Sequence, residues 1–415
     1  MGTVFQSLQL ITSDKTSEPA DYLYDGQKIE KISANSNDTS HDYLDCSGLL
    51  GSSGWIDLRC FAGEPGMEYR ETLESLCQTL AYGGFAQAVI LPNTKPALQS
   101  KNEIAFVQQR ARQFFPTLHI QAAITKDILG EDFTEMLDLH DQGIRIFGEG
   151  TNPLSHSDRM TKALQYLQKF DGILFDQAYD PMLALYGQMH EGYSSTLLGL
   201  KGIPTLAEEV AIQKNLAILR YSGGNLHFQT LSTAEGVRLI RQAKADGLQV
   251  TSDVSLYQLL FLDEDLSDFN TALKVMPPFR TREDREALVE GLTDGTIDAI
   301  VSNHIPHDFD SKHMEFDLAP FGMAGIQTFA AGLSLLEKEL GWPLLIDKIT
   351  KGPARVIKME EGEMRSLTVF DPKAIWKFDA ASNPSLSQNS PWFNAEVAGK
   401  VRYVVNGQKM VKIDE

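Results

Sequence analysis

Short β-rich runs alternate with helical stretches eight times between residues 55 and 302, and this alternation limits the folds open to the chain. Strands that alternate with helices form parallel sheets, because each helix returns the chain to the same edge of the sheet. Eight such units over about 250 residues predict an α/β fold of the (β/α)8 TIM type, with a doubly wound sheet as the alternative. The predicted strands cover 55–60, 86–91, 119–125, 144–147, 172–175, 226–231, 248–254 and 298–302.

The segments between these strands carry helix signals. Ser232 to Glu235 has the pattern of a capping box before a helix, and Thr281 to Asp284 begins another helix in the same way. An earlier helix is predicted to bury one face, whose residues recur at helical spacing: Leu73, Leu76, Cys77 and Leu80.

Both ends of the chain lack the helical stretches. Residues 1–53 contain short alternating runs at 7–12, 21–24 and 28–32, and the last residues contain apolar runs at 367–370, 375–378 and 401–405. We therefore predict a small β-sandwich domain built from residues 1–53 and 360–415. The barrel domain is predicted to cover residues 54–359.

Composition excludes several classes of partner. The 415 residues carry a formal net charge of −19, which argues against a nucleic-acid partner because such binders concentrate Lys and Arg. Neither a signal peptide nor an apolar run of about 18 residues is present, so no membrane contact is expected. The three cysteines form no CxxC spacing, which is typical of a reducing compartment. We expect a cytoplasmic protein.

The first barrel strand leads into a site. Trp55 to Leu58 is apolar, and the loop that follows is rich in Gly and Pro, so Arg59 and Phe61 should project from the carboxyl end of the strand. Residues two apart on a strand point the same way, and a metal hydrolase uses this spacing for a His-x-His pair. A guanidinium and a phenyl ring cannot bind a metal in this way.

Several further motifs carry a resemblance that covers nearly the whole chain. The order of these motifs resembles the dihydroorotases of the amidohydrolase superfamily. The resemblance implies a metal-bearing barrel with a small β-sandwich, which interconverts carbamoyl-aspartate and dihydroorotate in pyrimidine synthesis. The motifs are Gly54-Trp55-Ile56-Asp57-Leu58, Glu64-Pro65-Gly66, Leu91 to Pro96, Met189 to Gly192, Leu198 to Pro204, Glu208-Glu209, Leu231-Ser232-Thr233, Val275 to Arg280, His304 to His307, Ala319 to Gly322 and Pro353-Ala354-Arg355.

The same resemblance implies where the metal ligands and the catalytic aspartate should be. The catalytic aspartate position holds Asn303, whose amide cannot shuttle a proton. Zinc is expected for the family, but its ligands are missing here, so we predict no metal and no other cofactor. The former metal-ligand positions hold Arg59, Phe61, Glu149, Gln177, Thr230 and Asn303.

Substrate recognition is changed as well. The arginine expected two residues after Phe61 is Gly63, and the asparagine expected before two prolines is Met276. The candidate remnant ligand-binding residues are Asn93, His304, His307 and Gly322.

Each of these features has an alternative explanation. His304 and His307 could form a new metal site or be loop residues satisfied by hydrogen bonds, and we favour the second. Glu149 with Lys126 or Asp253 could be an acid–base set, but polar residues at barrel mouths often only bond to one another. The loop from Gly322 to Gly325 is more typical of a shaped loop than of a phosphate cradle.

Arg59 is the strongest departure from the family pattern. It could form a structural ion pair with Glu149 or Asp176, or it could bind a substrate, and the sequence favours neither. It could also fill the space that a metal ion once occupied.

Three functions follow from these observations. The main hypothesis is a dihydroorotase-like pseudoenzyme that has lost metal binding and catalysis and acts as a structural or regulatory partner, for example of aspartate transcarbamoylase. The alternative is an active dihydroorotase or related cyclic amide hydrolase with a non-standard site. A third is a binding module in which Arg59, Asn93 and His307 meet a small-molecule carboxylate. The resemblance also implies a homodimer.

Overall fold

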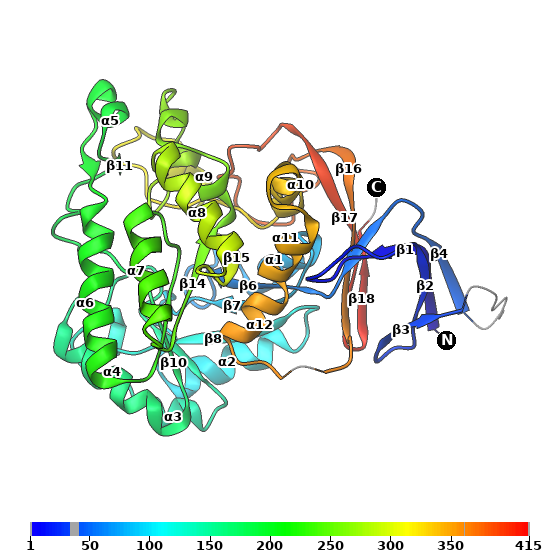
Figure 1. The fold of residues 1–415 in the computed structure, drawn as a ribbon, viewed down its shortest axis with the longest axis horizontal. Coiled ribbons are helices and arrows are strands. Elements are labelled where there is room, and N and C mark those ends of the chain that lie inside the picture. Colours follow the sequence, from blue (N-terminus) through cyan, green and yellow to red (C-terminus); the bar gives the residue numbers. More distant parts are fainter. Residues whose placement is uncertain (1, 34–40, 361, 414–415) are drawn as a thin grey trace.

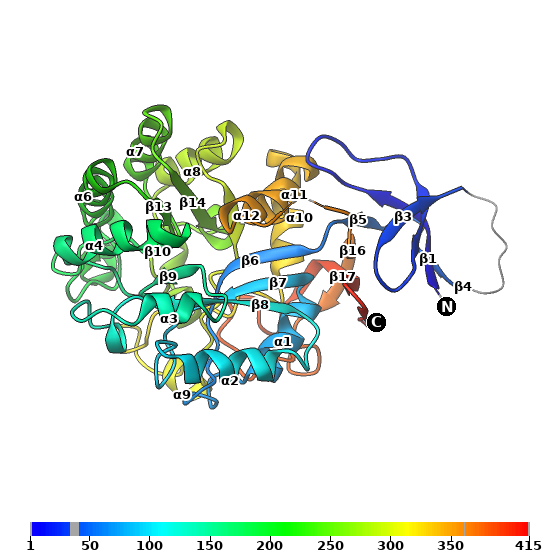
Figure 2. The ribbon, with the colours of Figure 1, turned by 90° about the horizontal axis from the view of Figure 1, so that it is seen from below.

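The computed structural model describes residues 2–33, 41–360 and 362–413. Eight parallel strands form its larger part, which confirms the predicted barrel and all eight predicted strands. Helices cover the outside of these strands (Figures 1 and 2). The barrel strands are β6 (Trp55–Cys60), β7 (Phe85–Ile90), β8 (Thr117–Ala123), β9 (Ile146–Gly148), β10 (Ile173–Asp176), β13 (Asn225–Phe228), β14 (Val250–Ser255) and β15 (Ala299–Val301).

The first and last strands of the barrel meet. The Phe61 amide donates to the His304 carbonyl oxygen at 2.8 Å, and the Ser302 amide donates to the buried Asp57 carboxylate at 3.0 Å. Cys60 and His304 form a parallel bridge next to these bonds. These contacts join the two edges that a doubly wound sheet would leave apart, so that alternative is wrong.

The helices begin and end close to the predicted positions. Thr281 caps α8 as predicted, but α7 is capped by Thr233 and not by Ser232. Ser232 and Thr233 both donate to the buried Glu208 carboxylate, and the Thr233 hydroxyl in addition accepts from the Gly236 amide at 3.0 Å. The helices are α1 (Leu73–Tyr82), α2 (Lys101–Ala111), α3 (Met136–His140), α4 (Ser157–Leu167), α5 (Tyr193–Leu198), α6 (Leu206–Ser222), α7 (Ala234–Ala245), α8 (Arg282–Asp294), α9 (Phe309–Lys312), α10 (Phe329–Leu340), α11 (Trp342–Ile349) and α12 (Lys351–Val356).

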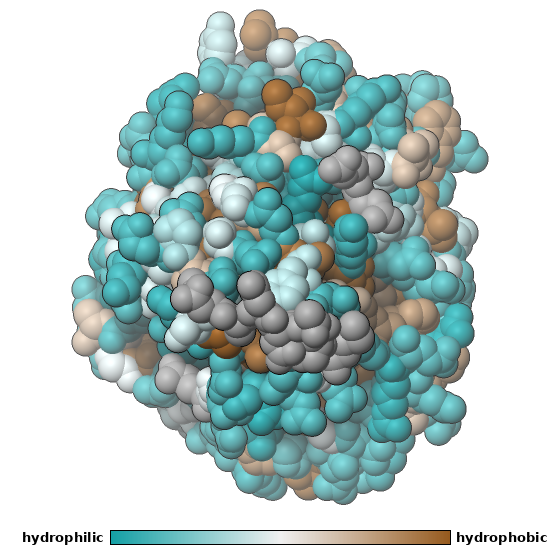
Figure 3. Space-filling model, turned by 90° about the vertical axis from the view of Figure 1, so that its right-hand side faces the viewer, coloured by the Kyte–Doolittle hydropathy of each residue, from teal (hydrophilic) through white to brown (hydrophobic). Residues whose placement is uncertain are grey.

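Strands from both chain ends form the second domain, as predicted. They make one mixed sheet in the order β18-β17-β16-β5-β1-β2-β3, with β4 paired to β1. Figure 3 shows this side of the molecule, which is mostly hydrophilic with small separate apolar areas. The predicted limits of 53 and 360 stay predictions. The strands are β1 (Gly2–Leu10), β2 (Ala20–Tyr24), β3 (Ile29–Ile32), β4 (His41–Asp45), β5 (Leu50–Ser52), β16 (Ser366–Lys377), β17 (Glu396–Asn406) and β18 (Lys409–Lys412).

A short excursion leaves the barrel between β10 and α6. It contains the parallel strands β11 (Met189–His190) and β12 (Gly202–Ile203) with helix α5 between them. In Figure 1 the excursion projects at the upper left, at the far end of the molecule from the sheet domain. Among the described residues, no helix is long and apolar enough to cross a membrane.

Candidate active-site pocket

A pocket of about 490 Å³ opens at the carboxyl ends of the barrel strands, where this fold places its chemistry. Arg59 and Phe61 both line it, as the strand pattern predicted. Of the other predicted positions, Asn93, Gln177, Asn303, His307 and Gly322 line it too, whereas Glu149, Thr230 and His304 do not. The remaining lining residues are Met67, Tyr69, Arg70, Lys95, Thr151, Tyr179, Met276, Ile305 and Phe321.

The buried Arg59 guanidinium joins several loops at the pocket floor. Its Nε donates to Asn303 Oδ1 at 2.9 Å, and one terminal nitrogen donates to Gln177 Oε1 at 2.6 Å. The other terminal nitrogen donates to the Gly150 carbonyl oxygen at 3.3 Å. Gln177 and Asn303 each donate in turn to the Met276 carbonyl oxygen at 3.3 Å. A cation therefore holds together two positions at which the resemblance implied a metal ligand and a catalytic acid.

Burial lowers the pKa of Arg59 to about 10, so the side chain still carries its charge at neutral pH. None of the ion pairs among the described residues joins Arg59 to Glu149 or Asp176, the two partners considered from the sequence. Arg59 instead bonds to neutral oxygens. The possibility that it binds a ligand stays a prediction.

The first loop of the barrel supplies a second guanidinium. Arg70 lies 4.1 Å above the centre of the Phe61 ring, and its Nε donates to the Pro306 carbonyl oxygen at 2.9 Å. The resemblance placed an arginine at position 63, but a Cβ at Gly63 would lie 2.2 Å from the Glu71 carbonyl oxygen. The path of the loop therefore excludes a side chain at 63 and brings Arg70 to the pocket instead.

Glu149 points away from the pocket. Its carboxylate accepts from the Thr125 amide at 2.9 Å and from the Thr125 hydroxyl at 2.8 Å. Burial raises its pKa to about 7. Asp253 accepts instead from His227 Nε2 at 2.9 Å, so the structure does not bring Glu149 and Asp253 together as an acid–base set.

Thr230 has a strained and poorly satisfied environment. Its φ is 53°, which is costly for a β-branched residue, and its buried hydroxyl has no partner among the described residues. Its amide donates to Asp253 Oδ1 at 2.6 Å. The backbone at this family position is thus held in place although the side chain cannot bind a metal.

Asn93 and His307 are both engaged by the protein. Asn93 donates to the Glu149 carbonyl oxygen at 3.1 Å and accepts from the Thr151 amide at 3.0 Å. His307 Nε2 lies 2.9 Å from the Phe321 carbonyl oxygen, to which it donates. Burial and the nearby Arg70 lower the His307 pKa to about 3, so its imidazole is neutral.

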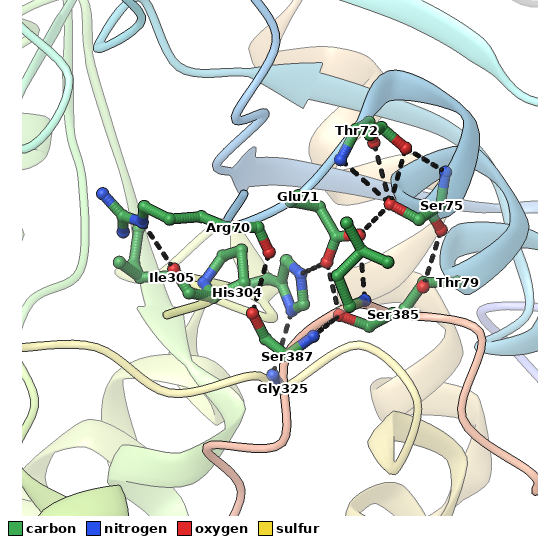
Figure 4. Close-up of polar contacts among 12 residues, drawn as sticks. Arg70, Glu71, Thr72, Ser75, Thr79, His304, Ile305, Gly325, Ser385 and Ser387 are labelled. Carbon is green, nitrogen blue, oxygen red and sulfur yellow. Dashed lines mark hydrogen bonds and ion pairs between the residues drawn. The ribbon is translucent and has the colours of Figure 1, made fainter. Parts of the chain in front are cut away.

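His304 lies outside the pocket, in a buried polar cluster (Figure 4). Its Nδ1 accepts from the Gly325 amide at 3.2 Å, and its Nε2 lies 3.7 Å from the carboxylate of Glu71. That carboxylate also accepts from the hydroxyls of Ser75 and Ser385. A contact between His304 and a ligand in the pocket is therefore not supported by its position.

The residues at the barrel mouth do not fit the metal that the resemblance implies. No group of three or more His, Cys, Asp or Glu side chains could hold a metal ion in the described part of the chain. His304 and His307 face different neighbours and do not share a site: His307 bonds to the Phe321 carbonyl oxygen, whereas the buried His304 Nε2 has no hydrogen-bond partner among the described residues. The Arg59 charge among Gln177 and Asn303 would also repel a bound cation.

The charge of the pocket differs from that of the whole chain. Arg59, Arg70 and Lys95 line it, and no Asp or Glu is among its described lining residues, although the chain carries a net charge of −19. Arg70, Lys95 and Tyr179 were not identified from the sequence as site residues. Lys95 lies inside the Leu91 to Pro96 motif, which was the available signal for it.

Comparisons with known proteins establish the ancestry. The family described as dihydro-orotase-like matches residues 49–236. The dihydroorotase of Syntrophus aciditrophicus is 35% identical over 392 residues, covering 92% of this chain and 92% of that protein. This chain belongs to the dihydroorotase family. The dihydroorotase of Pelotomaculum thermopropionicum is 36% identical over 409 residues, covering 96% of this chain and 95% of its own.

Solved structures confirm the fold. The L-hydantoinase (dihydropyrimidinase) of Arthrobacter aurescens superposes with a TM-score of 0.86 at 21% identity, covering 100% of this chain and 96% of that one. The dihydropyrimidinase of Brevibacillus agri superposes with a TM-score of 0.81 at 20% identity, covering 100% of this chain and 97% of that one. The family resemblance predicted from the motifs is thus confirmed, whereas loss of the metal centre and of catalysis stays a prediction.

Proposed function

We propose that this dihydroorotase-family protein binds a small carboxylate-bearing molecule of pyrimidine synthesis, of the dihydroorotate or carbamoyl-aspartate class, without metal-dependent hydrolysis. In this role it acts in the cytoplasm as a structural or regulatory partner, for example of aspartate transcarbamoylase. The observation that carries the proposal is the buried Arg59 guanidinium bonded to Gln177 and Asn303.

A guanidinium keeps one property of a metal ion and lacks another. It supplies positive charge and hydrogen-bond donors that suit a carboxylate. It cannot coordinate water and lower the pKa of that water from about 16 toward about 7, which metal-dependent hydrolysis requires. A pocket built around Arg59 can therefore still bind an anionic ligand of the family while it lacks the group that activates water.

The other cations support the same class of ligand. Arg70 uses its Nε on the Pro306 carbonyl oxygen, and one terminal nitrogen lies 3.4 Å from His307 Nε2, which leaves the other terminal nitrogen to donate to a ligand. Lys95 is exposed at the pocket, and its Nζ has no hydrogen-bond partner among the described residues. Two such donors beside Arg59 match the two carboxylates of carbamoyl-aspartate better than a neutral ligand.

A second candidate is an active cyclic amide hydrolase with a non-standard site. The relatives that match over nearly their whole length are named dihydroorotases. Their names support this candidate better than a loss of catalysis. Within the chain, Glu149 has a pKa of about 7, which suits a general base, but it bonds to Thr125 and does not line the pocket.

One set of assays separates the two candidates. Dihydroorotate hydrolysis is measured with the purified protein, with zinc in excess and with a chelator, and ligand binding is measured by calorimetry. We expect no turnover in either condition and binding of dihydroorotate or carbamoyl-aspartate. Turnover that is lost on chelation would contradict the proposal and favour the hydrolase.

Variants locate the binding. Arg70→Gln and Lys95→Gln should each weaken binding of carbamoyl-aspartate about tenfold, because each removes one charge-assisted hydrogen bond. Arg112→Gln, an exposed arginine outside the pocket, is the matched control and should leave binding unchanged. If all three variants bound carbamoyl-aspartate equally well, the ligand would bind outside this pocket. Capture of aspartate transcarbamoylase from a mixture of purified proteins tests the partner.

A further inference from the structure

Tyr179 is a pocket residue whose hydroxyl group forms no bond within the described part of the chain. It follows the last residue of β10 by three positions and lines the pocket together with Arg59. Its side chain is partly buried. Polar atoms that are fully buried and lack a partner occur elsewhere in the described residues, but the Tyr179 hydroxyl is not one of them. This hydroxyl therefore faces the open space of the pocket and is available to a ligand.

Backbone and side-chain bonds on both sides of Tyr179 fix its position. Residues two apart in an extended segment point the same way, and Gln177 and Tyr179 both line the pocket. On one side, Gln177 Oε1 accepts from the Arg59 guanidinium at 2.6 Å. On the other side, the Asp180 amide donates to the Ala207 carbonyl oxygen at 2.8 Å. The phenol is thus presented to the pocket by a held segment.

Arg59 retains donors beside this phenol. A guanidinium has five N–H groups, and three are taken by the oxygens of Asn303, Gln177 and Gly150. The other two lie one on each terminal nitrogen. Burial raises the pKa of Tyr179, and the nearby Arg59 charge opposes this rise only in part. The phenol is therefore protonated at neutral pH, so the pocket holds a neutral donor close to a charged one.

A ligand of the carbamoyl-aspartate class has one polar group left for these donors. In the proposed binding mode, Arg70 and Lys95 donate to its two carboxylates. The remaining group is the ureido group, whose carbonyl oxygen is a neutral acceptor with two lone pairs. No Asp or Glu is among the described lining residues, so no side-chain carboxylate of the pocket competes for the donors. A few placed polar groups of this kind fix the orientation of a ligand and give specificity.

We propose that Tyr179, together with Arg59, binds the ureido carbonyl oxygen of the ligand and thereby selects N-carbamoyl dicarboxylic acids over plain dicarboxylates. This inference rests on the proposed binding of a carbamoyl-aspartate-class ligand and adds the residue that selects it. Succinate carries the same two carboxylates without the ureido group, so it leaves both donors without a ligand acceptor. Tyr179 is in this way a specificity-determining residue.

Calorimetric titration of the full chain with carbamoyl-aspartate and with succinate tests this inference. The wild type should bind carbamoyl-aspartate about 100-fold more tightly than succinate, because each of two hydrogen bonds contributes about tenfold. Tyr179→Phe removes only the hydroxyl and should lower the affinity for carbamoyl-aspartate about tenfold, with the affinity for succinate unchanged. Tyr221→Phe, at a tyrosine on α6 that is 81% exposed, is the matched control and should change neither affinity.

The possible failures of the inference can be told apart. If Tyr179→Phe kept the wild-type ratio of the two affinities, Tyr179 would not select the ureido group, although ligand binding itself would stand. An equal loss for both ligands would assign the hydroxyl to a carboxylate and would overturn the inference as well. If the wild type bound no carbamoyl-aspartate, the inference and the proposed function would both fail.

Thermal unfolding excludes a structural role for the hydroxyl. Tyr179→Phe should unfold at the same temperature as the wild type, because the hydroxyl bonds to no described residue. A lower unfolding temperature would mean that the hydroxyl is bonded within the protein, and it would count against the inference.

Discussion

Asn303 and His304 are neighbours in the sequence, yet they belong to two buried polar groups of opposite charge. Asn303 faces the pocket and accepts from the Arg59 guanidinium at 2.9 Å. His304 faces the other side, where its Nε2 lies 3.7 Å from the Glu71 carboxylate. The inner group surrounds a cation with neutral oxygens, and the outer group surrounds a carboxylate with hydroxyls and an imidazole.

The two groups differ in what they hold in place. The inner group lines the pocket, so its charge is available to a ligand. The outer group ties the first barrel loop to residues 385–387, because Ser385 donates to Glu71 and Ser387 donates to the Arg70 carbonyl oxygen at 2.9 Å (Figure 4). The comparison teaches that the inner group offers its charge to the pocket, while the neighbouring cluster holds the loop that carries Arg70.

Removal of the buried cation should have the largest effect. Arg59→Met leaves Gln177 Oε1 and Asn303 Oδ1 without their donor, and each unsatisfied buried acceptor costs about 1–3 kcal/mol. We expect a loss of about 3 kcal/mol in the free energy of unfolding, measured in urea. Arg112→Met is the exposed control and should change stability by less than about 0.5 kcal/mol. A small loss for Arg59→Met would mean that the inner group is not a structural unit.

Substitution in the outer group should lower stability less than removal of Arg59 does, and should change the position of the first barrel loop more. Glu71→Ala removes the acceptor of Ser75 and Ser385, and we expect a loss of about 2 kcal/mol. Freed from residues 385–387, Arg70 should also bind carbamoyl-aspartate more weakly. Glu71→Gln, which keeps one acceptor oxygen, should restore part of the stability and part of the affinity for carbamoyl-aspartate. Unchanged ligand affinity in Glu71→Ala would separate the outer group from the pocket.

The pH dependence of stability provides a third comparison, centred on Glu149. Burial raises its pKa to about 7, so between pH 4.5 and 7 the unfolded chain releases this proton while the folded chain keeps it. The free energy of unfolding therefore falls as pH rises through this window and levels off above pH 7. Glu149→Gln lacks this proton. Its free energy of unfolding, measured relative to that of the wild type, should therefore rise by on the order of 2 kcal/mol from pH 5 to pH 7.

Urea unfolding at several pH values measures this difference. Asp57, with a pKa raised to about 7, and Asp176, raised to about 6, act in the same direction in both proteins and cancel in the comparison. Glu135→Gln, an exposed substitution, should keep the slope of the wild type. Parallel curves for Glu149→Gln and the wild type would show that Glu149 is ionised in the folded protein.

The smallest effect is expected at Thr230. Glycine adopts a φ of 53° without strain, and Thr230→Gly keeps the amide that donates to Asp253 while it removes a buried hydroxyl that has no partner. These gains exceed the greater entropy of glycine in the unfolded chain, so we expect a gain of about 0.5 kcal/mol. A loss of stability in thermal unfolding would mean that the buried methyl group contributes more than the strain costs.

Much of the fold could be predicted because its signals are local. Alternating strand and helix patterns located all eight barrel strands, and the end segments located the mixed sheet. The hydrogen bonds from Ser232 and Thr233 to Glu208 could not be predicted, because Glu208 lies 24 residues before Ser232 in the chain. This carboxylate is brought there by the packing of α6 against α7.

The sequence by itself determined which residues occupy the family positions. It placed Arg59, Phe61, Gln177 and Asn303 where the resemblance implied metal chemistry. Only the tertiary structure decided what these residues do. A guanidinium selects partners by distance and direction, and the folded barrel offers Arg59 neutral oxygens rather than the carboxylates considered from the sequence. Arg70 reaches the pocket because the loop closes over Gly63, a contact between segments that no local pattern records.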